Sequence, residues 1–199
     1  MSKVLTLYSS ARPDGNTFQH VNTFNQLVPG EICYLDSLEI AQYDYQFRNQ
    51  NDDFSTLIDN MLNVDVIILA SPVYWYSLTP TMRRFFDRLT DLTELPELKA
   101  KGKKMREKSF YLFATSVHPN PPASFTFPVE KTLEYLGWRF MDSVHLDCKE
   151  GFSETLAISS FQQLAEKLRV NVEKHLCPLR GSSDYSLQGR SSINALYLS

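Results

Sequence analysis

The sequence predicts a single α/β domain, a three-layer sandwich around a five-stranded parallel sheet of strand order 2-1-3-4-5. Short β-prone stretches alternate along the chain with segments in which apolar residues recur at helical spacing. Because right-handed crossovers return the chain to the same edge of a sheet, this alternation favours parallel strands. The 199 residues are enough for one such domain, in which roughly 70% of the unfolded surface becomes buried.

Five stretches are expected to form the strands. Residues 66–70 are continuously apolar, which is typical of a central strand covered by helices on both faces. The other strands are expected at residues 4–8, 32–35, 109–115 and 139–146.

Helices are expected between the strands. The apolar residues between Phe54 and Leu62 follow the spacing of a helix that buries one face. Thr79 and Pro80 provide an N-cap and a first helical residue for a helix that ends near residue 91. The remaining helices are expected at about 18–28, 128–136 and 153–176, with Gly137 as a C-cap, while 37–51 is predicted irregular and the basic stretch 99–108 a solvated connection.

Composition excludes several classes of function. The net charge of -3 leaves no positive excess for a nucleic-acid backbone or an anionic membrane. No apolar run approaches the ~20 residues that span a bilayer, and the first ten residues lack a secretory leader, so a cytoplasmic location is expected. Three widely spaced cysteines favour structural thiols over a disulfide framework or a metal site.

Two loops carry the chemistry, because ligands of such sheets bind at the carboxyl ends of strands one and three. The first loop supplies hydroxyl, amide and guanidinium groups before a helix N-terminus, a setting that favours a phosphate; these are Ser9, Ser10, Arg12, Asn16 and Thr17. The alternative is that they only cap the helix. The loop matches neither the dinucleotide pattern G-x-G-x-x-G nor a triphosphate loop.

The second loop places adjacent aromatic residues after the central strand. Tyr74 and Trp75, preceded by Pro72 and Val73, can face a flat ring such as an isoalloxazine. The alternative is that these rings pack beneath the loop as part of the core.

The two loops together resemble those of the NAD(P)H-dependent FMN reductases and quinone reductases of the flavodoxin-like superfamily, over about Lys3 to Leu146. The family's first-loop pattern Gly-Ser-x-Arg-x-x-Gly-Asn-Thr is matched at residues 9–17, with Ser9 in place of the glycine. Its Ser-Pro-Val-Tyr segment and following Met-Lys-x-Phe-x-Asp-Arg helix are similar to residues 71–74 and 82–88. The loop after strand four, often glycine-rich in the family, here begins with Thr115 and Ser116.

The resemblance implies an FMN-binding domain over residues 1–177, with a tail of uncertain structure at 178–199. FMN would lie between the two loops, with Thr115 and Ser116 at the far rim, and NADPH or NADH would reduce it by hydride transfer. A quinone, flavin or similar flat acceptor would then reoxidise it at the same face. A homodimer or higher homo-oligomer is expected, and the family's four-cysteine cluster motif is absent from residues 36–53.

Several alternatives stay open from the sequence. A flavodoxin-type electron carrier shares the fold and cofactor but is usually more acidic, and a degenerate domain would act as an interaction module. His118 is either a proton donor or a solvated loop residue, while His20, His145 and His175 are interpreted as structural. The aromatic residues Tyr43, Tyr45 and Phe47 form a dimer contact, a pocket wall or a satellite of the core.

Overall fold

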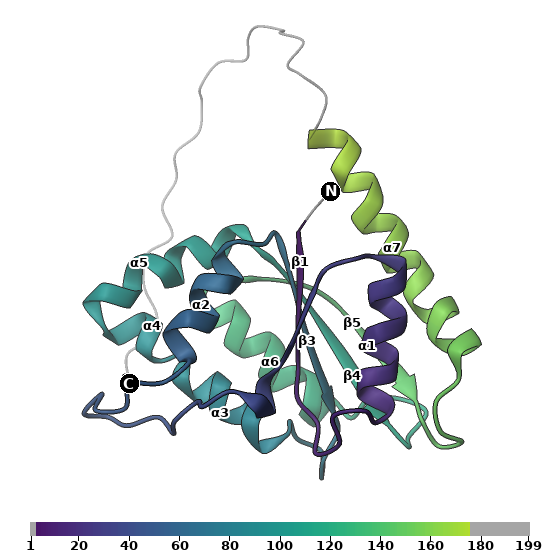
Figure 1. Cartoon of the computed structure of the whole chain (residues 1–199), viewed down its shortest axis with the longest axis horizontal. Helices are drawn as coiled ribbons and strands as arrows, with labels where there is room; N and C mark the ends of the chain where they lie inside the picture. Colours follow the sequence, from purple (N-terminus) through teal and green to yellow (C-terminus); the bar gives the residue numbers. More distant parts are fainter. Residues whose placement is uncertain (1–2, 176–199) are drawn as a thin grey trace, which may run out of the picture.

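The fold was determined as a computed structural model that describes residues 3–175. One parallel sheet runs through it in the order β2-β1-β3-β4-β5, which confirms the predicted fold class (Figure 1). The strands are β1 (Val4–Tyr8), β2 (Glu31–Tyr34), β3 (Val66–Pro72), β4 (Ser109–Ser116) and β5 (Arg139–Asp147). Their carboxyl ends lie at the lower edge of the sheet in Figure 1.

Helices cover both faces of the sheet, which makes the three layers of the sandwich. One face is covered by α1 (Asn16–Leu27) and α7 (Glu154–His175), and the other by the remaining helices (Figure 1). These are α2 (Phe54–Leu62), α3 (Pro80–Arg88), α4 (Asp91–Glu94), α5 (Pro96–Lys104) and α6 (Ala123–Tyr135), with single 3-10 turns at Leu35–Ser37 and Met105–Glu107.

The central strand β3 has a hydrophobic core on each side. Ile67 and Leu69 belong to the core under α2 to α6, whereas Ile68 and Ala70 belong to the core under α1 and α7. All four are almost completely buried. The continuous apolar pattern of this strand therefore follows from burial on two faces.

The prediction that residues 99–108 form a solvated connection is wrong, because α5 and a 3-10 turn occupy most of this stretch. Leu98 and Met105 are buried at a spacing of two helical turns, and lysines cover the rest of the surface. Gly102 lets α5 approach α4 closely, since a Cβ there would lie 2.9 Å from the Leu92 carbonyl oxygen. The Trp138 indole also donates to the Gly102 carbonyl oxygen at 3.1 Å.

The helix predicted to begin at Pro128 begins five residues earlier, at Ala123, with Pro128 inside it. The proline removes one backbone hydrogen bond, but the earlier start buries Phe125 on the same face as Val129 and Leu133. Gly137 ends the helix as expected, with a φ of 71° in the left-handed region, although the C-cap residue itself is Leu136.

The other expected elements agree with the structure to within a few residues. Thr79 caps α3 by accepting a hydrogen bond from the Met82 N–H at 3.3 Å. In α7, Leu156 is exposed and Ala157 takes the buried position expected of it. None of the helices in residues 3–175 is long and apolar enough to cross a membrane. The tail predicted at 178–199 lies outside the described residues.

Candidate functional site

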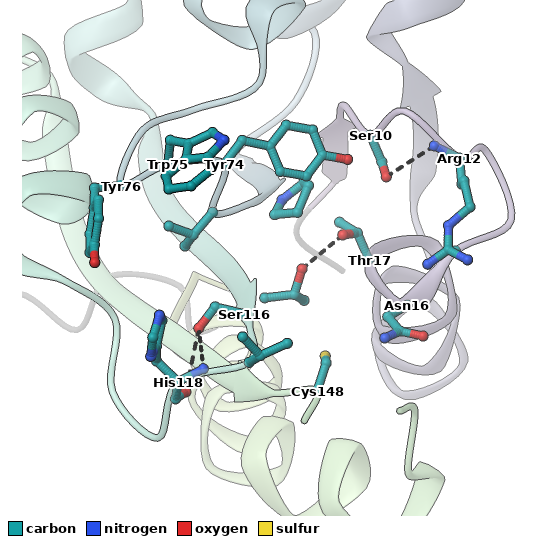
Figure 2. Close-up of a pocket in the computed structure, with 15 residues that line it drawn as sticks. Ser10, Arg12, Asn16, Thr17, Tyr74, Trp75, Tyr76, Ser116, His118 and Cys148 are labelled. Carbon is teal, nitrogen blue, oxygen red and sulfur yellow. Dashed lines mark hydrogen bonds between the residues drawn. The ribbon is translucent and has the colours of Figure 1, made fainter. Parts of the chain in front are cut away.

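A pocket of about 310 Å³ lies at the carboxyl ends of β1, β3 and β4, where the strand order reverses. Every residue predicted for the site except Ser9 lines it (Figure 2). The full lining consists of Ser10, Arg12, Gly15, Asn16, Thr17, Pro72, Val73, Tyr74, Trp75, Tyr76, Thr115, Ser116, Val117, His118 and Cys148. Residues as far apart in the sequence as Ser10 and Cys148 thus meet in one cavity. Its volume lies at the lower end of the size range of ligand sites.

Ser9 does not face the pocket. Its side chain is fully buried and its hydroxyl bonds to the hydroxyl of Thr79, the N-cap of α3. The Ser9 N–H continues the sheet by donating to the Ala70 carbonyl oxygen at 3.0 Å. A side chain at this position therefore ties the first loop to α3 and leaves the ligand side of the loop unobstructed.

The polar side chains of the first loop do not cap α1, which contradicts the capping alternative. The N-cap is Gly15, and among residues 3–175 no side chain makes a capping hydrogen bond to the start of the helix. Thr17 instead bonds through its hydroxyl to the Thr115 hydroxyl at 2.8 Å, across to β4. The helix start is therefore free to bind an anion through its N–H groups and its partial positive charge.

Side chains from neighbouring elements fix the backbone of the first loop. The Ser10 N–H donates to Asp36 at 3.0 Å, and the Ser10 carbonyl oxygen accepts from the Tyr34 hydroxyl at 2.8 Å. Tyr74 reaches across from the second loop, and its hydroxyl accepts from the Ala11 N–H at 3.2 Å. The pocket is consequently built on a preorganised loop.

Arg12 supplies a cation beside the start of α1 (Figure 2). Gly15 leaves room for it, since a Cβ there would lie 3.3 Å from the Arg12 Cβ. Among residues 3–175, the guanidinium forms no ion pair with a carboxylate. Its charge is therefore free to pair with an anionic ligand.

The second loop turns sharply and presents its rings to solvent. Tyr74 and Ser77 exchange two backbone hydrogen bonds, and the two residues between them have positive φ angles of 47° and 64°. Trp75 is 92% exposed, so the alternative that these rings belong to the core is contradicted. Two aromatic residues in the left-handed region store backbone strain of a kind that clusters at ligand sites.

Relieving that strain gives a test of stability. Replacing Trp75 by asparagine and Tyr76 by glycine is expected to raise the free energy of unfolding by roughly 1 to 3 kcal/mol, because these residues suit both central positions of the turn. Urea denaturation measures the change, with the single variant Trp75→Ala as control because it keeps a side chain at positive φ. An unchanged or lower stability of the double variant would show that the rings stabilise the turn.

Ser116 and His118 form the far rim, and His145 lies behind Ser116. The Ser116 hydroxyl accepts from the His118 N–H at 3.1 Å and lies 2.8 Å from His145 Nε2. The His118 ring stacks near Tyr76, with centroids 6.5 Å apart (Figure 2). Burial lowers the pKa of His145, while Asp147 opposes that shift. Burial also raises the pKa of Cys148, so its thiol stays protonated near neutral pH.

Comparison with known proteins identifies the family. The family model for NADPH-dependent FMN reductase matches residues 2–150. The chain belongs to this family. The predicted resemblance is thereby confirmed, and the FMN reductase fold carries the pocket at the edge where the resemblance expects it.

Individual relatives of this FMN reductase family member are distant. YwqN of Bacillus subtilis, a candidate NAD(P)H-dependent FMN-containing oxidoreductase by its description, is 25% identical over 118 residues, which are 56% of this chain and 65% of that protein. The matched region therefore spans just under two thirds of that relative's length.

Solved structures share the fold. The Trp repressor binding protein from Bacillus subtilis has a TM-score of 0.63 at 20% identity, covering 83% of this chain and 97% of that one. A quinone reductase candidate from Klebsiella pneumoniae has a TM-score of 0.59 at 14% identity, covering 86% and 85%. At these identities the likeness shows the fold alone.

Sequence reasoning missed part of the FMN reductase pocket. Tyr76 and Cys148 line the pocket, and the partner of Ser116 is His145, which the sequence interpretation left as structural. Cys148 directly follows β5, so the rule that ligands bind at strand ends could have found it. Within residues 3–175, no group of three or more metal-ligating side chains lies together.

Proposed function

We propose that the protein is an FMN-dependent oxidoreductase that passes electrons from NADPH or NADH to a quinone, a flavin or a similar flat acceptor. One observation carries the proposal. A single pocket combines an uncapped helix start beside a free arginine with exposed aromatic rings, which are the two kinds of surface that FMN needs. Membership of the FMN reductase family supports it.

The residues present fit FMN at both ends. Ser10, Arg12 and Asn16, with the N–H groups at the start of α1, would hold the phosphate. Pro72, Val73 and the Tyr74–Tyr76 rings would hold the isoalloxazine, with Thr115 and Ser116 at its far rim. When bound, the flavin supplies hydride acceptance and donation, and the protein orients it and limits access of water.

A single pocket implies that donor and acceptor use it in turn. The first loop, which lines the pocket, would already hold the FMN phosphate, and the sequence contains no second nucleotide-binding motif. NAD(P)H would therefore stack over the exposed side of the ring, near Trp75, and leave before the acceptor enters. Ping-pong kinetics are expected from this arrangement.

Two experiments test the proposal, first the binding of FMN and then the reduction of the bound flavin. We expect one FMN per chain, measured by quenching of flavin fluorescence at micromolar concentrations, and reduction of the bound flavin by NADH or NADPH, measured by loss of flavin absorbance after rapid mixing. An absence of binding would favour the interaction-module alternative. Binding with bleaching slower than minutes at millimolar NAD(P)H would favour the electron carrier, which takes electrons from a protein reductase.

The assembly and location of the protein stay predictions. The residues Tyr43, Tyr45 and Phe47 pack on one another outside the pocket and outside both cores, and Tyr45 is 86% exposed. The exposure of this aromatic cluster supports a role for it as a contact between copies of the chain in the expected homo-oligomer. Sedimentation equilibrium would measure the oligomeric state. The expected cytoplasmic location rests on the sequence.

A further inference from the structure

A hydrogen-bonded serine and histidine lie at the far rim of the pocket. Ser116 lines the cavity, and its hydroxyl lies 2.8 Å from Nε2 of His145, a half-buried residue that does not line it. The Ser116 hydroxyl also accepts from the His118 N–H at 3.1 Å (Figure 2). His145 therefore reaches the ligand space only through Ser116.

A break in the β4–β5 register brings this pair together. Phe110 pairs with Phe140, but Tyr111 pairs with Asp142, so β5 contains one extra residue at this point. Without it, Ser116 would pair with Leu146, and His145 would project from the opposite face. Such irregularities near sites commonly re-aim a side chain, and this one aims His145 at the pocket wall.

The two protonation states of His145 give Ser116 opposite roles toward a ligand. In the neutral tautomer that carries its proton on Nδ1, Nε2 is the nearest acceptor for the Ser116 O–H, because the His118 carbonyl oxygen is 3.4 Å away. Ser116 then offers the pocket only a lone pair. A protonated imidazole donates through both nitrogens, so Ser116 accepts from it and its own O–H is free to turn to the pocket.

We infer that His145 is a positioning residue of this site: its protonation turns the Ser116 hydroxyl into a donor toward a carbonyl or anionic oxygen on the edge of a flat ring. The inference rests on the proposed function, because flavins and quinone-type acceptors supply such an oxygen.

The same pair has the arrangement of a proton relay. A quinone-type acceptor that has received a hydride carries an anionic ring oxygen and lacks one proton. Ser116 gives its hydroxyl proton to that oxygen, and His145 gives its Nε2 proton to Ser116, which leaves a neutral imidazole and an intact serine. His145 then regains a proton from water.

The direction of the pH dependence follows from this linkage. Burial sets the pKa of His145 below the ordinary histidine value of about 6.5, with Asp147 raising it and His118 lowering it. In the described part of the chain, no group on α6 or α7 shifts this pKa. The donor form of Ser116 exists below the pKa of His145, so affinity for the ring falls as pH rises through it, and a bound ring raises that pKa.

Riboflavin binding measures the linkage, because riboflavin lacks the phosphate that would titrate in FMN. We expect the affinity of the wild-type chain to weaken about three- to ten-fold between about pH 5 and about pH 8. NMR titration of the histidine rings should show the pKa of His145 raised in the riboflavin complex.

Three variants separate positioning from a structural role. His145→Gln and Ser116→Ala are expected to bind riboflavin with no pH dependence, although His145 still titrates in Ser116→Ala. Ser116→Thr keeps the hydroxyl and should restore the dependence. His118→Gln is the comparison variant, since it removes a neighbouring ring that does not bond to Ser116. It should keep the pH dependence, with the midpoint moved to higher pH because His118 lowers the pKa of His145.

Two results would overturn the inference. One is a pH dependence that survives in His145→Gln, and the other is a dependence that vanishes in His118→Gln alone. Failure of the proposed function has a different signature, which is wild-type protein that binds neither FMN nor riboflavin at any pH; the pocket then holds no flat carbonyl ring and the inference falls with it. Matching thermal unfolding temperatures confirm that each variant is folded.

Discussion

Replacing Arg88 by leucine is expected to lower the free energy of unfolding by about 3 to 5 kcal/mol, a large part of the 5 to 15 kcal/mol typical of a domain. Arg88 lies at the end of α3 and is 1% exposed. Its guanidinium bonds to Asp91 at 2.8 Å and to Asp52, and both carboxylates are buried with it. Loss of the cation would leave two buried carboxylates without a positive charge to balance them.

The cluster around Arg88 also organises the irregular segment between β2 and α2. Asp52 accepts from the Ala41 N–H at 2.8 Å and from the Phe54 N–H at 3.1 Å, and Arg88 donates to the Ala41 carbonyl oxygen at 3.3 Å. The guanidinium carbon lies 4.7 Å from the centre of the Phe54 ring. The segment predicted as irregular is therefore held by side chains in place of a backbone ladder.

Urea denaturation of Arg88→Leu tests this, with Arg83→Leu as the matched control on the same helix. Arg83 pairs with Asp87 at 2.9 Å, but the two side chains are 58% and 44% exposed, so its loss should change stability by less than about 1 kcal/mol. Adding Asp52→Asn and Asp91→Asn to Arg88→Leu should recover part of the loss, because no buried charge then remains. Equal effects of the two arginine variants would contradict the argument.

Local patterns of the sequence were enough to predict the sheet. The apolar stretch of β3 and the helical spacing of apolar residues in α2 both result from burial of residues that are close together in the chain. The spacing and composition of these segments are therefore enough to predict the strand and the helix. In α5 the same signal is weak because Leu98 and Met105 are separated by lysines and a glycine. The lysines of that stretch lie on the solvent-exposed face of α5, so the local charge gives no indication that the opposite face is buried.

The candidate site was predictable where a short motif carries it and unpredictable where tertiary contacts do. Arg12 and Trp75 follow from the residues of two loops placed at strand ends. The hydrogen bond between Ser116 and His145 depends on a one-residue shift in the β4–β5 register, which no local sequence pattern predicts. Likewise, Ser9 turns away from the ligand because of Thr79, which lies 70 residues away.

Replacing Arg12 by alanine is expected to weaken binding of FMN by roughly ten- to over a hundred-fold, the usual effect of losing a hydrogen bond to a charged group. Riboflavin, which lacks the phosphate, should bind within about three-fold of wild type. Arg12 suits this test better than Thr17, whose hydroxyl is committed to Thr115 and whose side chain is 3% exposed. Parallel fluorescence titrations of wild type and variant with the two flavins give the loss of affinity for FMN relative to the loss for riboflavin.

The structure explains why this substitution separates recognition from stability. Arg12 is exposed and, within residues 3–175, has no ion-pair partner, so its removal leaves no charge stranded and the fold should be unaffected. Arg12→Lys keeps the charge but loses the two-pronged geometry and should give intermediate affinity. Arg48→Ala, an exposed arginine paired with Asp44 far from the pocket, controls for net charge. Equal weakening of FMN and riboflavin by Arg12→Ala would mean that the first loop shapes the pocket without binding a phosphate.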